Sequence, residues 1–204
     1  MPKSLTKKLN APVTYFFCLG EAPIQQETEV FGMTIRTDRL QLRPLCVNDL
    51  KTAHEYACDA EKTKYMLFLP NATEQETADF LQSVEQEWQQ AHPSFFEFAI
   101  ILDDVHIGAV SISLCEASHQ GEIGWILNKK HWNHGYASEA AKAVLDFAKT
   151  QLHLQSVIAQ CDWRNIASAK VMEKIGMLLV DANGIRTYTK REETARELTY
   201  RIEF

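Results

Sequence analysis

Apolar and polar residues recur along the chain with the period of a strand in some segments. Residues 39–45 (RLQLRPL) alternate between the two classes, which predicts a half-buried strand. Residues 95–102 and 106–114 are apolar runs separated by Asp103-Asp104, and this arrangement predicts a β-hairpin. Residues 121–127 (GEIGWIL) predict a third strand of the same meander. Gly108 lies inside the second run, where a glycine indicates a bulge or a close backbone approach.

Four other segments carry apolar residues at the 3.6-residue spacing of an amphipathic helix. They begin near Leu50, after Thr73, near Ala137 and after Asn165. We expect Asn48 and Asp49 to cap the first helix, and Thr73 with Glu76 to form a capping box at the second. The second helix carries Phe80, Leu81 and Trp88, which its spacing assigns to the core or to a cleft wall, and His92-Pro93 should end it.

The order of these elements predicts an α+β fold with a mixed sheet. The strand at 121–127 and the apolar run at 156–161 are joined by a helix, so they should pair in parallel through a crossover. The chain should end in two further strands, separated by an Asn183-Gly184 turn and closing with residues 197–204. Cys161 lies in the buried strand and has no neighbour that indicates a nucleophile.

Composition narrows the class of protein. The chain has 204 residues, of which 46% are apolar and 24% charged, which suits one globular domain over residues 33–204 after an irregular extension over residues 1–32. The net charge of −6, without a Lys/Arg block, argues against a nucleic-acid partner. No apolar stretch is long enough for a membrane span, and the N-terminal apolar run is too short and broken for a signal peptide. Five scattered cysteines without a C-x-x-C pair make a disulfide framework unexpected, so we expect a cytoplasmic protein.

The segment HWNHGYASEA (131–140) connects the third meander strand to a helix. The N–H groups of a first helical turn lack intrahelical partners, so amides from His134 to Ser138 could bind a diphosphate without a cationic side chain. The local sequence is equally compatible with a plain tight turn. His131 and His134 have no third ligand nearby, so we expect no metal. A dinucleotide-dependent enzyme is disfavoured, because neither G-x-G-x-x-G nor G-x-x-x-x-G-K-[ST] occurs.

Four segments in one order carry a family resemblance. They are TDRLQLR (37–43), GEIGW (121–125), WNHGYASEA (132–140) and NIASAKVMEKIGM (165–177). Together they resemble the GCN5-related N-acetyltransferase (GNAT) superfamily over roughly residues 34–181, and most of all its ribosomal-protein N-terminal acetyltransferase subgroup. The resemblance implies a GNAT-type acyl-CoA N-acyltransferase fold, in which a mixed sheet contains a splayed parallel strand pair and helices cover both faces.

The resemblance also implies a site for acetyl-coenzyme A (acetyl-CoA) between the splayed strands, and no metal. The pantetheine arm would pair with backbone at Gly124, Trp125, Ile126 and Leu127. The diphosphate would lie on the amides of Trp132, Asn133, His134, Gly135, Tyr136, Ala137 and Ser138. Asn133-His134 replaces the subgroup's usual Gly-Lys, so we expect a modest contribution from His134 that fades as pH rises. Lys170 and Lys174 lie four positions apart, which favours a solvated helix face over a role as phosphate ligands.

The resemblance assigns catalytic roles to a few residues. Glu122 is the expected general base, although a solvated strand carboxylate would look the same. A backbone N–H within residues 124–126 would stabilise the oxyanion. Many members use a tyrosine where this chain has Met172; the subgroup uses a serine, which Ser168 matches, and a water molecule is the alternative donor to the thiolate. Asn165 would contact the cosubstrate, yet both Asn165 and Ser168 also suit a plain helix start.

The expected function is direct acetyl transfer from acetyl-CoA to a primary amine in a ternary complex. The acceptor is a protein N-terminus or a small amine such as a polyamine or an aminoglycoside, and fold does not decide between them. A hypothesis from another class is a non-catalytic acyl-CoA-binding module, since the usual tyrosine is absent. A homodimer is compatible with the sequence, which does not determine the oligomeric state.

Overall fold

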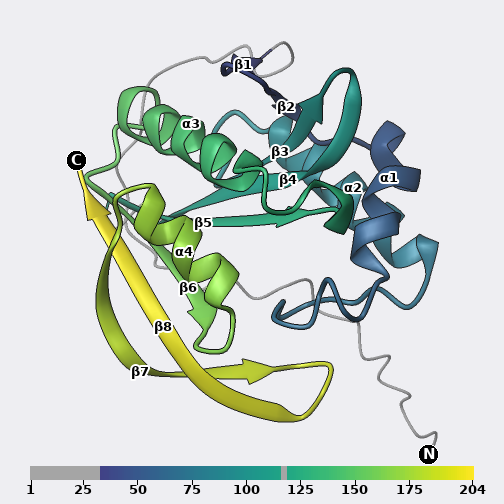
Figure 1. Cartoon of the computed structure of the whole chain (residues 1–204). Coiled ribbons are helices and arrows are strands. Elements are labelled where there is room, and N and C mark those ends of the chain that lie inside the picture. The colour runs from purple at the N-terminus through teal and green to yellow at the C-terminus, as the bar shows by residue number, and fades with distance from the viewer. Residues whose placement is uncertain (1–32, 116–118) are drawn as a thin grey trace, which may run out of the picture.

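One mixed sheet of eight strands organises the chain in the computed structural model, which describes residues 33–115 and 119–204 (Figure 1). The expected extension over residues 1–32 lies outside the described residues. The strands are β1 Ile35–Arg36, β2 Gln41–Pro44, β3 Phe95–Leu102, β4 Val105–Cys115, β5 Gln120–Leu127, β6 Ser156–Asp162, β7 Leu178–Tyr188 and β8 Glu193–Glu203. Their spatial order is β1-β2-β3-β4-β5-β6-β8-β7. The helices are α1 Leu50–Ala57, α2 Glu74–Trp88, α3 Tyr136–Thr150 and α4 Ile166–Lys174, with short 3₁₀ turns at Val47–Asp49 and Lys129–His131.

The predicted α+β order is confirmed, including the meander of β3, β4 and β5. Gly108 has both expected features. The β3–β4 register shifts between Ile100 and Ile101, opposite this part of β4, which marks a bulge. A Cβ atom on Gly108 would also lie 2.2 Å from the Ile126 carbonyl oxygen, so only glycine permits this approach of β4 to β5.

The pair β5 and β6 is parallel, as predicted, and it separates part-way along. The parallel register runs only from Gln120–Ser156 to Glu122–Ile158. Beyond that point β5 stays paired with β4 as far as Leu127, and β6 stays paired with β8 as far as Asp162. The two strands therefore splay after Glu122 and leave one edge of β5 unpaired, which confirms the expected V-shaped opening.

Helices cover both faces of the sheet. Phe96 and Phe98 of β3 each make edge-to-face contacts with Trp88 of α2, at 5.1 Å between ring centroids, and with Phe147 of α3. These rings form the core between the sheet and α2 and α3. On the other face, Tyr56 of α1 lies edge-on to a strand residue, His106. Burial of these large apolar side chains is the main stabilising contribution to the fold.

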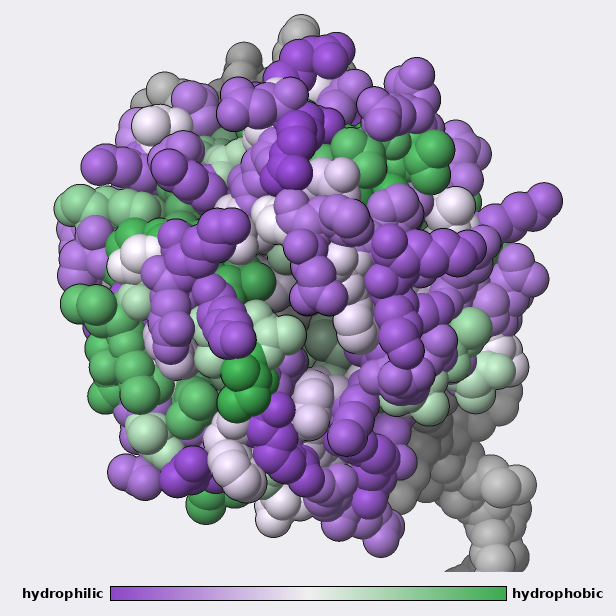
Figure 2. Space-filling model, viewed as in Figure 1, coloured by the Kyte–Doolittle hydropathy of each residue, from purple (hydrophilic) through white to green (hydrophobic). Residues whose placement is uncertain are grey.

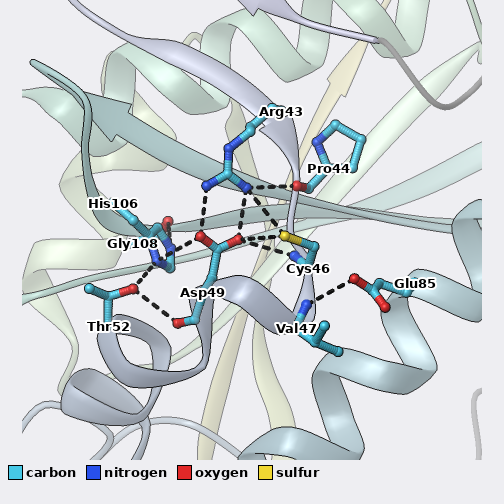
Figure 3. Close-up of polar contacts among 9 residues, drawn as sticks. All are labelled: Arg43, Pro44, Cys46, Val47, Asp49, Thr52, Glu85, His106 and Gly108. Carbon is cyan, nitrogen blue, oxygen red and sulfur yellow. Dashed lines mark hydrogen bonds and ion pairs between the residues drawn. The ribbon is translucent and has the colours of Figure 1, made fainter.

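A polar network fixes the start of α1 against β2 and β4 (Figure 3). Arg43 donates two hydrogen bonds of 2.7 Å to the Asp49 carboxylate. Burial alone would raise the pKa of Asp49, but the hydrogen bonds from Arg43 and from the Cys46 N–H hold this pKa below its usual value. His106 lies 2.7 Å from the Thr52 hydroxyl and 2.9 Å from the Gly108 carbonyl, and burial lowers its pKa. The Nε2 of His106 contacts the Gly108 carbonyl, while the Thr52 hydroxyl lies between the His106 Nδ1 and the Asp49 carbonyl, to which it donates at 2.9 Å.

Several details expected at the helices differ in the structure. Asp49 stands at the start of α1 but its side chain makes no capping hydrogen bond there, because its carboxylate is engaged by Arg43. Phe80 is 42% exposed, whereas Leu81 and Trp88 are buried as expected.

The two ends of α2 also differ from the expectation. Thr73 caps α2 by accepting from the Glu76 N–H, but the Glu76 carboxylate accepts from the Ala72 N–H and not from that of Thr73. The capping box is therefore only half formed. The helix ends at Trp88, before the His92-Pro93 signal.

The prediction of a turn at Asn183-Gly184 is also wrong. β7 runs without interruption from Leu178 to Tyr188, and the hairpin turn to β8 lies at residues 189–192. The β7–β8 register shifts on both sides of Asp181, so the Asn-Gly pair forms part of an irregular strand. The N–H of Asn183 donates to the Asp181 carboxylate, an Asx turn that lies within this irregular part of the strand.

The face shown in Figure 2 is mostly polar, and its largest group of apolar residues lies on the left of the view, the side along which β7 runs in Figure 1. β7 is the edge strand of the sheet, and Leu178, Val180 and Ile185 are all more than half exposed. Among residues 33–115 and 119–204, no helix is both long and apolar enough to cross a membrane.

Candidate active site

The first turn of α3 lies beside the splayed strands and lacks a side-chain cap. Its N-cap is Gly135, which has φ 81° and no side chain that could accept from the first-turn amides. By contrast, Thr73 caps α2 and Asn165 caps α4. The N–H groups of Tyr136, Ala137 and Ser138 are therefore left for a ligand or for solvent. Unpaired N–H donors and the positive end of the helix dipole are the features that the expected diphosphate cradle requires.

Trp132 folds back onto the end of β5. Its indole Nε1 donates to the Leu127 carbonyl at 2.8 Å, which ties the loop to the strand that precedes it. Asn133 follows with φ 64°, a left-handed conformation that asparagine tolerates better than most residues. His134 stacks on Tyr136 with ring centroids 5.6 Å apart. These contacts hold the loop against the end of β5 and the first residue of α3.

The turn between β1 and β2 holds the same loop from the other side, which sequence reasoning missed. Arg39 donates to the His134 carbonyl at 3.0 Å and to the Glu139 carboxylate at 2.7 Å. Thr37 donates its hydroxyl hydrogen to Glu139 as well. The Arg39 guanidinium also lies 4.6 Å from the centre of the Tyr136 ring. A carboxylate in the first turn of α3 is favourable beside the positive end of the helix dipole.

The directions of the backbone groups along β5 show which N–H could donate to a ligand in the opening between β5 and β6. The carbonyl oxygens of Glu122 and Ile126 point toward β4. The Ser113 hydroxyl donates to the Glu122 oxygen at 3.4 Å, and Gly108 lies against the Ile126 oxygen. Successive residues of a strand direct their N–H and C=O groups to opposite edges. The N–H and C=O of Trp125 therefore point toward the splay, beyond the last β5–β6 pair. The Leu127 carbonyl points the same way but already accepts from Trp132.

Glu122 lies on β5 at the last β5–β6 pair, where the splay begins. It shares its face of the strand with Gly124, as the alternation predicts, while Ile123 on the other face is buried. Glu122 keeps contact with solvent, but the protein around it removes much of its water and raises its pKa. The nearby Glu197 carboxylate raises this pKa further, and Arg186 opposes the shift. A carboxylate with a raised pKa is a stronger base than an ordinary surface glutamate.

Three charged residues near this face were missed by sequence reasoning. Arg186 of β7 pairs with Glu197 of β8 and donates to the Tyr65 carbonyl at 3.3 Å, which links the hairpin to the α1–α2 loop. The Nε of Arg186 is buried without a hydrogen-bond partner among the described residues. Glu97 is buried in β3, and loss of water raises its pKa to about 8. A single glutamate inside the apolar run FFEFAIIL was the signal available for it.

The start of α4 is built as expected. The Asn165 side chain accepts from the backbone N–H of Ser168 at 3.2 Å, so the cap is real. The Ser168 hydroxyl does not take part in that bond. Met172, which stands where many GNAT members have a tyrosine, is buried in the core. Cys161 is buried as predicted, and burial raises the pKa of its thiol to about 11.

A cavity of about 360 Å³ lies between the α1–α2 loop and the β7–β8 turn. Its lining residues are Ala60, Thr63, Lys64, Leu69, Pro70, Lys190 and Arg191. Three of these side chains are cationic and none is acidic. Lys190 also donates to the Pro70 carbonyl at 2.9 Å, and Thr189 donates to the Leu67 carbonyl, so the turn and the loop are joined across the cavity.

Comparison with known proteins matches this architecture. The model of the acetyltransferase (GNAT) domain matches residues 39–178. The uncharacterized N-acetyltransferase YnaD of Bacillus subtilis (strain 168) is 34% identical over 149 residues, which are 71% of this chain and 82% of that protein. The crystal structure of an acetyltransferase (GNAT family) from Bacillus anthracis is 31% identical with a TM-score of 0.71, and the match covers 84% of this chain and 98% of that one.

Two more distant structures share the fold. One is RimL, a ribosomal L7/L12 alpha-N-protein acetyltransferase in complex with coenzyme A (16% identity, TM-score 0.74, 84% of this chain and 98% of that one). The other is spermidine N-acetyltransferase from Vibrio cholerae in complex with CoA and spermine (16% identity, TM-score 0.71, 82% of this chain and 96% of that one). Their acceptors differ, so the shared fold does not select one. The family model and the Bacillus relatives establish that this chain belongs to the GNAT family of acetyltransferases.

Proposed function

We propose that the protein transfers the acetyl group of acetyl-CoA directly to a primary amine. The observation that carries this proposal is the opening between β5 and β6, which ends beside the uncapped first turn of α3. A long thioester cosubstrate with a diphosphate needs both features at once. Its arm needs a strand edge with free backbone groups, and its diphosphate needs unpaired N–H donors.

The residues present fit such a cosubstrate. Trp125 offers an N–H and a C=O along the free edge, and the first turn from Gly135 to Ser138 offers several N–H groups without side-chain caps. Gly135 has no Cβ that would narrow the approach to these amides. When bound, acetyl-CoA would supply the activated acetyl group as a thioester.

The proposed chemistry assigns one role to each residue. Glu122, directly or through one water molecule, takes the proton that an ammonium must lose before its nitrogen can attack the acetyl carbon. The Trp125 N–H donates to the oxygen on which negative charge develops. The new C–N bond forms as the C–S bond breaks, and the Ser168 hydroxyl or a water molecule donates a proton to the departing sulfur. The attack occurs in a ternary complex, with no acetylated residue on the protein.

We propose a protein N-terminus as the acceptor in preference to a polyamine. The cavity beside the α1–α2 loop is lined by Lys64, Lys190 and Arg191 and by no acidic residue. Lys190 and Arg191 already pair with Glu76 and Glu193, so the lining offers a second ammonium group no free carboxylate. An amine on a peptide can place backbone carbonyls or acidic side chains against the cationic lining of the cavity, whereas protonated spermidine has no acceptor groups.

The test is release of free thiol from acetyl-CoA in the presence of an amine panel. The panel contains peptides with free N-termini, matched peptides with acetylated N-termini, spermidine and an aminoglycoside. The proposal predicts thiol release with a free peptide N-terminus and intersecting initial-velocity plots, as a ternary complex requires. Turnover with spermidine alone would contradict the acceptor assignment. Tight binding of CoA without turnover of any amine would favour the non-catalytic module instead.

A further inference from the structure

Two cationic side chains from distant parts of the chain meet at Gly135. The Lys174 ammonium lies 3.4 Å from the position that a Cβ on Gly135 would occupy, and an Arg39 guanidinium nitrogen lies 3.6 Å from the same position. Lys174 comes from the last turn of α4, and Arg39 comes from the β1–β2 turn. Both therefore reach the loop residue that starts α3, although they are 135 positions apart in the sequence.

The two cations differ in their pairing. Arg39 forms a salt bridge with Glu139 and donates to the His134 carbonyl, so its charge is balanced and its role is to hold the loop. Lys174 has no hydrogen bond or ion pair with any residue of the described ranges 33–115 and 119–204. An unpaired ammonium beside unpaired N–H groups leaves an excess of positive charge at this point of a protein whose net charge is −6.

We propose that Lys174 binds the diphosphate of coenzyme A and supplies a side-chain charge beside the first-turn amides of α3. This inference rests on the proposed function, because it concerns the same cosubstrate. The GNAT subgroup that the loop resembles has Gly-Lys where this chain has Asn133-His134, so residues 131–138 carry no permanently charged side chain. Lys129 and Lys130 lie at the start of the loop, and Lys129 pairs with Glu61. Lys174 delivers a cation to the same amides from α4. A flexible lysine stem suits this task, because it acts as a point charge and needs no fixed planar geometry.

Lys170 provides an internal comparison. It lies one helical turn before Lys174 on α4 and is exposed, and it makes no contact with Gly135 within 4 Å. Sequence spacing alone groups the two lysines on one solvated face. The structure separates them, because only Lys174 reaches the start of α3.

The experiment compares Lys174→Met with Lys170→Met by calorimetric titration of the full-length protein with CoA and with dephospho-CoA. Lys174→Met should weaken the binding of both ligands by about five- to tenfold in low salt, and the loss should shrink as ionic strength rises. Lys170→Met should leave both dissociation constants unchanged. Equal losses for the two ligands assign the contact to the diphosphate, which both contain.

Three results would overturn the inference. They are unchanged affinity in Lys174→Met, an equal loss in Lys170→Met, or a loss that disappears with dephospho-CoA, which would assign the contact to the 3′-phosphate. Thermal melting of each variant without ligand shows whether the fold is intact, and both side chains are exposed, so we expect no change. Failure of the wild-type protein to bind CoA would instead contradict the proposed function, so the two failures are distinguishable.

Discussion

The Trp132 indole donates a hydrogen bond to the Leu127 carbonyl at 2.8 Å and so closes the loop that precedes α3 onto the end of β5. This bond takes up the last carbonyl of the free strand edge, and it holds the backbone from Asn133 to Gly135 close to the splay. The two halves of the proposed cosubstrate site, the strand edge and the helix start, are thereby joined by one side chain.

Trp132→Phe should separate the hydrogen bond from the ring. The phenyl group retains most of the packing but leaves the Leu127 carbonyl without its donor, which costs about 1 kcal/mol. We expect the KM for acetyl-CoA to rise about fivefold while kcat changes less than twofold. Steady-state kinetics with varied acetyl-CoA check this expectation. A large fall in kcat with an unchanged KM would show that Trp132 acts on the chemical step instead.

Ser168→Ala tests the proton donor without disturbing the helix cap. Asn165 accepts from the backbone N–H of Ser168, which alanine retains, so α4 should keep its stability. We expect kcat to fall about tenfold to a hundredfold and the dissociation constant for CoA to stay the same. Asn165→Ala is the contrasting variant, because it removes the cap and should lower the free energy of unfolding by about 1 kcal/mol. Undiminished kcat in Ser168→Ala would assign the proton donation to water.

Glu97→Gln should change the pH dependence of stability. The folded protein holds the Glu97 pKa at about 8, against an ordinary value of 4.5, so folding takes up a proton between these pH values. The stability of the wild type should therefore fall as pH rises from about 4.5 to 8, by an amount on the order of a few kcal/mol. The variant should lack this slope and be the more stable protein at pH 8. Denaturant unfolding at several pH values measures this, and parallel curves for the two proteins would contradict the pKa assigned to Glu97.

His134→Ala tests whether the imidazole adds charge to the phosphate contact. A protonated histidine beside a diphosphate should strengthen binding, so the variant should bind CoA about threefold more weakly at pH 6. At pH 8, where histidine is ordinarily neutral, the two proteins should have the same affinity. Equal affinity at pH 6 would show that His134 contributes only its backbone and its stacking on Tyr136.

The elements that position the site could be predicted because their signals are local. The alternation in GEIGWIL, the cap at Asn165 and the crossover between β5 and β6 each depend on residues close in sequence. The prediction of a turn at Asn183-Gly184 failed because β7 pairs with β8 on both sides of this dipeptide, and this pairing overrides its turn preference. The prediction that Asp49 caps α1 failed because its carboxylate accepts hydrogen bonds from Arg43 of β2 instead.

The charged residues around the site could not be predicted because their partners are distant in sequence. Arg39 meets Glu139 across 100 positions, and Arg186 meets the Tyr65 carbonyl across 121. The spacing of apolar residues along the chain does not indicate contacts between residues so far apart. Lys170 and Lys174 show the same limit, since their spacing is that of one helix face and only the position of α3 distinguishes them.

The most direct test of the central claim is the pH–rate profile of acetyl transfer to a peptide N-terminus by the wild type and by Glu122→Gln. Because Glu122 acts as the base only when ionised, kcat/KM of the wild type should rise with pH through its raised pKa. Glu122→Gln should lose this dependence and on the order of 100-fold in kcat/KM, while CoA binds with unchanged affinity. A Glu122→Gln variant with wild-type rates and the same profile would contradict the account.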